Sequence, residues 1–81
     1  MMRIWLRRAE LDAMLTRELR RVAGCDGSIL IAGAPIPVAD FERSNWADFT
    51  VTSAPGSDES LVRAVAGGVV SAMRETYNVV D

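Results

Sequence analysis

The chain has 81 residues, a formal net charge of −2 and a single cysteine, and it contains no histidine and no lysine. An intrachain disulfide is therefore excluded, as is a zinc site of four Cys and His ligands. The length predicts one small domain, residues 1–81. No run approaches the roughly 20 apolar residues of a membrane span, and the first residues lack the apolar core of a signal peptide. We expect a cytoplasmic protein that does not bind membranes.

A first helix is predicted over residues 8–23, and Gly24 is suited to end it. Its apolar residues recur at helical spacing, at Leu11, Leu15, Leu19 and Val22. Ahead of this helix, residues 2–6 alternate in a way that fits a short strand, although a helix extension or coil fits them as well. We favour an irregular arm that packs Trp5 or Leu6 onto the domain.

Two strands and a second helix follow. The predicted elements are a strand over 28–32, a loop over 34–45, a strand over 47–53 and a helix over 57–76. Ser57 is the expected N-cap of this helix. Gly67 and Gly68 inside the helix cost about 1 kcal/mol each relative to alanine. Either another backbone therefore approaches closely at these glycines or the helix breaks there. Residues 77–81 are interpreted as a tail.

The order of these elements, α-β-β-α, predicts an α+β fold. It has two layers, with two helices packed on one face of an antiparallel two-stranded sheet. Alternation along the strands decides which side chains share a face. We assign to the helix-facing side Ile29, Ile31, Phe49 and Val51. The opposite side then receives Leu30, Ala32, Thr50 and Thr52, with Trp46 if the strand begins there.

That opposite side predicts self-association. A face carrying Leu30, Trp46 and Thr50 is unlike a fully hydrated surface, and both strands of a hairpin are edges with unpaired backbone groups. We therefore expect a homodimer formed through the strand edges or the open sheet face. An unidentified protein partner is the related possibility. Alternatively, the segment 34–46 or the N-terminal arm covers this face.

Enzymatic chemistry is poorly supported by the residue types. Without histidine or lysine, the serines lack the usual bases, so we predict no catalytic residue, resident metal or cofactor, and lean towards a protein that is not an enzyme. Cys25 is interpreted as a small buried residue. One alternative stays open near the 34–48 loop. Its carboxylates, which could hold a divalent metal ion or a small ligand, are Asp40, Glu42 and Asp48.

Nucleic-acid binding by the first predicted helix is a second hypothesis. Arg17, Arg20 and Arg21 lie within about one turn, and arginine suits phosphate recognition. Against this, the sequence pI is near 5, unlike the usual basic footprint of such proteins. Some arginines also have partners within the helix, because Arg8–Asp12 and Arg21–Glu18 are spaced to form ion pairs. We therefore rank nucleic acid below self-association.

Several short motifs of this chain are similar to those of a group of small proteins. They are Ala9-Glu10-Leu11, the run Leu19–Cys25, Asn45-Trp46 ahead of a strand, and Tyr77-Asn78-Val79-Val80 at the end. In these the chain resembles small uncharacterised proteobacterial proteins with an α-β-β-α outline. The resemblance implies a bacterial cytoplasmic setting and brings no functional residue with it. Asn45-Trp46 is its best candidate feature. Trp46 is interpreted as a core anchor, with Asn45 capping the loop, or as the lining of a ligand pocket under the 34–46 loop.

Overall fold

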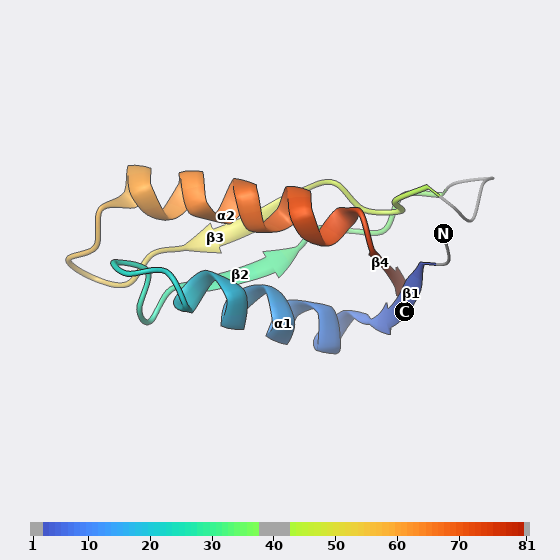
Figure 1. Ribbon diagram of the computed structural model, residues 1–81, viewed down its shortest axis with the longest axis horizontal. Helices are drawn as coiled ribbons and strands as arrows, with labels where there is room; N and C mark the ends of the chain where they lie inside the picture. Colours follow the sequence, from blue (N-terminus) through green and yellow to red (C-terminus); the bar gives the residue numbers. More distant parts are fainter. Residues whose placement is uncertain (1–2, 38–42, 81) are drawn as a thin grey trace.

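The structure, a computed structural model, describes residues 3–37 and 43–80. In chain order its elements are β1 (Ile4–Arg7), α1 (Arg8–Arg20), β2 (Ile29–Ala32), β3 (Phe49–Thr52), α2 (Glu59–Arg74) and β4 (Tyr77–Val80). Figure 1 shows an elongated molecule in which the two helices run along the long axis and the β2–β3 pair runs with them. The α+β class is confirmed.

The strands at the two ends of the chain extend the predicted order. β1 and β4 form a parallel two-stranded sheet in which Leu6 lies opposite Val79, and Figure 1 shows this pair at one end of the molecule. The order is therefore β-α-β-β-α-β rather than α-β-β-α. The tail interpretation of residues 77–81 is wrong for Tyr77–Val80. The irregular arm predicted over residues 2–6 is wrong for residues 4–6, which belong to β1, although Leu6 does pack against the core.

The β2–β3 pair is antiparallel, as predicted, but its faces are reversed on one strand. Leu30 lies opposite Val51, and Ile31 lies opposite Thr50. Directly opposed residues share a face, so Leu30 joins the core side and Ile31 the outer side. The assignment of Ile29 and Ile31 to the helix-facing side, and of Leu30 and Ala32 to the opposite side, is wrong. Phe49 and Val51 do pack against the core.

Both predicted helices are present with shorter bounds. α1 ends at Arg20, and the chain then turns through Gly24, whose φ of +91° favours glycine. α2 begins one residue after Asp58, whose carboxylate accepts hydrogen bonds from the N–H groups of Ser60 and Leu61. Asp58 is therefore the N-cap, not Ser57. Asp and Ser are similarly good caps, so their order along the chain could not decide between them.

The two central glycines do not break α2, which is continuous through Gly67 and Gly68. A Cβ built at either position meets no atom within 4 Å. Close approach of another backbone within the described chain is therefore not what places glycine there.

The core lies between the helices and the inner side of the β2–β3 sheet. Three leucines of α1 are fully buried, at the predicted spacing of four residues. They meet residues from α2, β2, β4 and the segments between elements. The buried apolar residues are Leu11, Leu15, Leu19, Cys25, Leu30, Ala32, Trp46, Val62, Ala66, Val70 and Val79. The interpretation of Cys25 as a small buried residue is confirmed.

Candidate interaction surfaces

The outer edge of β2 is covered by polar side chains of α1. Thr16 Oγ1 donates to the Leu30 carbonyl at 2.9 Å and accepts from the Leu30 N–H at 3.0 Å. Asp12 Oδ1 accepts from the Ala32 N–H at 2.7 Å. Arg8 donates to the Ala32 carbonyl at 2.8 Å, and Arg20 donates to the Ser28 carbonyl at 2.8 Å. We call Arg8, Asp12, Thr16 and Arg20 the α1 ladder.

The α1 ladder has a simple origin in the sequence. Its members are spaced by four residues, so they form one ridge along the helix. The neighbouring ridge, one residue behind, carries the buried leucines Leu11, Leu15 and Leu19. The helix therefore places its leucines in the core and its polar ridge on the strand edge at the same time. A strand edge that would expose N–H and C=O groups is paired without another strand.

The bonds of the α1 ladder, together with the strand register, show which backbone groups of β3 point away from β2. In an antiparallel pair, the residues of each strand alternate between bonding to the partner and pointing away from it. Gly33 donates to the Asp48 carbonyl, and Leu30 and Ala32 bond outward to α1. By the observed register, the backbone groups of Phe49 and Val51 point away from β2. Among the described residues, these groups have no hydrogen-bond partner.

The outer face of the β2–β3 sheet is open. Ile29 and Ile31 are 47% and 40% exposed, and Thr50 and Thr52 beside them are also exposed. Within residues 3–37 and 43–80, both isoleucines therefore keep a large part of their surface exposed. The predicted alternative, in which the N-terminal arm covers the open face, is not seen. Of the 34–46 segment, residues 38–42 lie outside the described part of the chain.

The three arginines singled out in the first helix lie together but differ in their partners. Arg17, Arg20 and Arg21 line one groove of about 670 Å³ beside Ile31. Arg20 bonds to the Ser28 carbonyl, and Arg21 forms a 3.3 Å ion pair with Glu18. This pair was predicted from its spacing, as was the longer Arg8–Asp12 contact of 4.0 Å. Two of the three arginines thus already bond within the chain.

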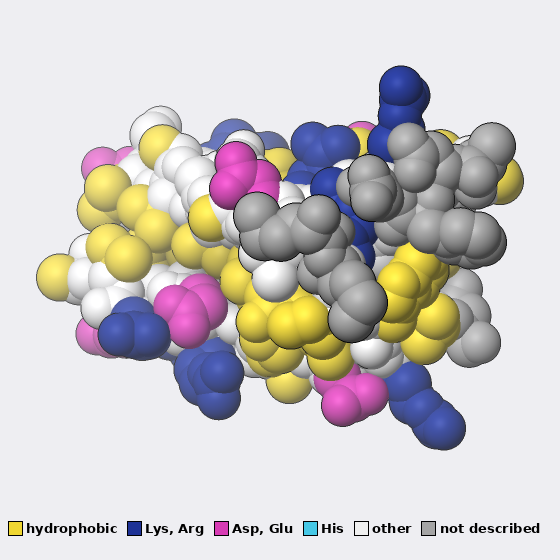
Figure 2. Space-filling model, turned by 45° about the vertical axis from the view of Figure 1, so that its right-hand side comes forward, with side chains coloured by type: hydrophobic (Ala, Val, Ile, Leu, Met, Phe, Trp, Pro, Cys, Tyr) yellow, Lys and Arg dark blue, Asp and Glu magenta, His cyan; other side chains and the backbone are white. Residues whose placement is uncertain are grey.

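A second groove, of about 380 Å³, lies between the helices. It is lined by Glu18 of α1 and by Val65, Gly68, Val69, Ala72 and Met73 of α2. Figure 2 shows one face of the molecule, on which apolar side chains form a band along its length and charged side chains lie beside them. The molecule therefore exposes apolar surface in more than one place, as the half-exposed isoleucines of β2 also show.

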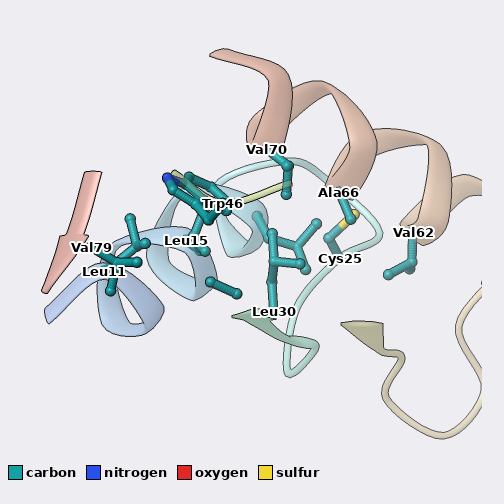
Figure 3. Close-up of a cluster of buried hydrophobic side chains, with 11 residues drawn as sticks. Leu11, Leu15, Cys25, Leu30, Trp46, Val62, Ala66, Val70 and Val79 are labelled. Atoms are coloured by element: carbon teal, nitrogen blue, oxygen red, sulfur yellow. The ribbon is translucent and has the colours of Figure 1, made fainter. Parts of the chain in front are cut away.

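Asn45 and Trp46 join the loop to β4. The Trp46 indole N–H donates to the Tyr77 carbonyl at 2.9 Å. The Asn45 side chain donates to the Val79 carbonyl at 2.7 Å and accepts from the Val79 N–H at 2.9 Å, so its amide pairs with β4 as a neighbouring strand would. In Figure 3 the Trp46 ring lies among core side chains of both helices. Trp46 is fully buried, which supports the core-anchor interpretation over a ligand pocket.

The predicted interface residues are separated by the structure. Leu30 and Trp46 are each 0% exposed, so they cannot line an open face of this chain. Trp46 precedes β3 and does not follow the alternation of that strand. Thr50 does lie on the exposed outer face. Of the three residues, only Thr50 stays a candidate contact.

The acidic alternative cannot be assembled from the described residues. Asp40 and Glu42 lie outside the described part of the chain. Asp48 is exposed and directly precedes β3, and its carbonyl accepts a hydrogen bond from the Gly33 N–H. Within residues 3–37 and 43–80, no group of three or more Cys, Asp or Glu side chains is placed to hold a metal ion. Neither helix described there is long and apolar enough to cross a membrane.

Comparisons of the chain with family models, with curated proteins and with solved structures yield no match. The residues that sequence reasoning missed are the α1 ladder and the outward groups of Phe49 and Val51. The ladder did leave a signal, because polar residues recur every four positions beside the leucines. The outward groups of β3 follow only from the strand register.

Proposed function

We propose that this protein is a non-enzymatic interaction module that self-associates as a homodimer through its β2–β3 sheet. The observation that carries this proposal is the incompleteness of that sheet on one side. Ile29 and Ile31 are about half exposed on its outer face, and β3 has one edge without partners among the described residues. A two-stranded sheet gains stability when further strands or a packed layer complete it.

Self-association explains this surface better than nucleic-acid binding does. The exposed sheet residues are apolar or carry hydroxyl groups, whereas recognition of a phosphate backbone needs unengaged cations. Arg20 and Arg21 are held by Ser28 and Glu18. A homodimer with two-fold symmetry lets one incomplete sheet complete another.

The test is the oligomeric state of the unmodified chain. Sedimentation equilibrium and native mass spectrometry, from low to high micromolar concentration, should show a monomer–dimer equilibrium. Added oligonucleotide should leave the mass distribution unchanged. A chain that stays monomeric throughout this range contradicts the proposal, and an oligonucleotide complex that weakens with salt replaces it by the nucleic-acid alternative.

A further inference from the structure

We infer that the contact is an edge-to-edge one, in which β3 of one copy pairs antiparallel with β3 of a second copy to give a continuous four-stranded sheet. This inference rests on the proposed self-association and names the surface and its partner strand. It begins from the backbone of Phe49 and Val51. Their N–H and C=O groups point away from β2 and have no partner among the described residues.

The two edges of the β2–β3 sheet differ, and only the β3 edge is available to a new strand among the described residues. The other edge, on β2, is occupied by the α1 ladder and offers Leu30 and Ala32 no bond to a new strand. Two of the features that protect edge strands are missing from β3, since Phe49–Thr52 contains no charged residue and no proline. An added strand satisfies N–H and C=O groups that packing of sheet faces cannot reach.

Charge disfavours the face-to-face alternative. The groove that carries Arg17, Arg20 and Arg21 also contains Ile31, so the arginines border the outer face of the sheet. A symmetric contact centred on Ile31 would place the same patch on both copies. It would therefore bring arginines of one copy towards those of the other, which is unfavourable. Edge pairing keeps both arginine groups apart.

The backbone geometry restricts the register. In a symmetric antiparallel pair, the outward-pointing residues of one β3 must lie opposite outward-pointing residues of the other. With Phe49 and Val51 outward, the two registers that pair the largest part of Phe49–Thr52 with the same strand of the second copy place the two-fold axis beside Thr50 or beside Val51. In the first register Thr50 faces Thr50 of the second copy, and in the second register it faces Thr52. Threonine pairs across strands are favourable in both cases, and no like charges meet.

The experiment compares one charge placed at two positions of the same face. Thr50→Lys puts an ammonium group beside the proposed contact, on an exposed side chain. Ile31→Lys puts the same group directly opposite Thr50, but on β2 and away from the edge. We expect Thr50→Lys to raise the dissociation constant of the dimer at least about tenfold, while Ile31→Lys changes it about twofold or less. Circular dichroism confirms that both variants are folded.

The outcomes separate this inference from the proposed function. If Ile31→Lys abolishes the dimer and Thr50→Lys does not, the contact is face to face, and the edge inference is wrong while self-association stands. If the unmodified chain is monomeric, both fail.

Cysteine cross-linking then determines the register in which the two β3 strands pair. Because Cys25 is fully buried, an introduced cysteine is the accessible thiol. Under mild oxidation, Thr50→Cys alone should form a covalent dimer if the axis lies beside Thr50. A mixture of Thr50→Cys and Thr52→Cys should form the mixed disulfide if the axis lies beside Val51. Failure of both in a chain that dimerises overturns the inference.

Discussion

The two outer edges of the β2–β3 sheet belong to strands of equal length, yet the chain treats them differently. The β2 edge is paired by side chains of α1, which supply donors and acceptors to Leu30, Ala32 and Ser28. The β3 edge receives no such bonds among the described residues. On α2 the ridge beside the buried Val62, Ala66 and Val70 consists of Glu59, Arg63, Gly67 and Ser71. Glu59 and Arg63 line a hollow together with Val51 and Thr52, but among the described residues no side chain of this ridge bonds to the β3 backbone. A helix completes a strand edge only when the side chains of such a ridge reach the strand's backbone groups.

The difference between the two edges limits how the sheet can grow. An edge completed by side chains blocks sheet growth on that side, because its backbone groups are already bonded. An edge left open permits growth on the other side alone. The sheet can therefore gain strands in one direction, which favours a closed pair of copies over an open-ended fibre.

The largest expected effect comes from breaking the α1 ladder at Asp12. Asp12→Ala should lower the free energy of unfolding by about 2–3 kcal/mol, because the buried Ala32 N–H loses a bond to a charged acceptor. Asp12→Asn keeps an acceptor oxygen and should lose less. Urea denaturation of the monomer measures both values. Equal losses in the two variants would show that the charge, and not the hydrogen bond, matters at this position.

A smaller effect is expected from a matched pair of threonines, one at each edge. Thr16→Val should cost about 1–3 kcal/mol, because it removes the partner of both backbone groups of the buried Leu30. Thr50→Val lies on the exposed face and should change the stability of the monomer by about 0.5 kcal/mol or less. Urea denaturation, again on the monomer, compares the two. Similar losses in both variants would remove the distinction between the edges.

The helices and the two central strands could be predicted because their signals are local. Apolar residues at every fourth position mark the buried side of α1, and Gly27 and Gly33 bracket the β2 run. The alternation of residues 2–6 fits a helix extension or coil as well as a strand, and residues 77–81 are interpreted as a tail, so neither end of the chain gives a signal that decides. β1 and β4 are short, and each depends on a partner at the other end of the chain. No pattern within five residues can reveal a pairing between Ile4 and Tyr77.

The prediction of which β2 residues face the core was wrong for a different reason. Its sequence, Ile-Leu-Ile-Ala, is apolar at every position, so alternation cannot say which side is buried. The register with β3 decides it, by placing Leu30 opposite Val51. Trp46 failed similarly as an interface residue, because β3 begins after it and its indole bonds to β4 instead. The candidate contact could therefore be predicted as far as the sheet and Thr50, but not as far as the β3 edge.

A still smaller loss of stability is expected from a third pair of substitutions, which compares an arginine of the α1 ladder with one outside it. Arg20→Ala should cost about 1 kcal/mol, because the Ser28 carbonyl loses its bond to the guanidinium at the end of the α1 ladder. Arg17→Ala removes an exposed arginine from the same groove and should cost about 0.5 kcal/mol or less. Thermal unfolding of the monomer measures both. A larger loss for Arg17 than for Arg20 would place the end of the ladder elsewhere.

The mildest test changes no residue and follows the amides of both edges by hydrogen exchange. The N–H groups of Leu30 and Ala32 are bonded to α1 side chains, so they should exchange slowly at every protein concentration. Those of Phe49 and Val51 point outward and should exchange quickly in the dilute monomer. As the concentration rises and β3 pairs with a second copy, they should slow, while Thr50→Lys should keep them fast. Slow exchange of Phe49 and Val51 at every concentration would mean that another part of the same chain already occupies this edge, and the two edges would then differ only in what covers them.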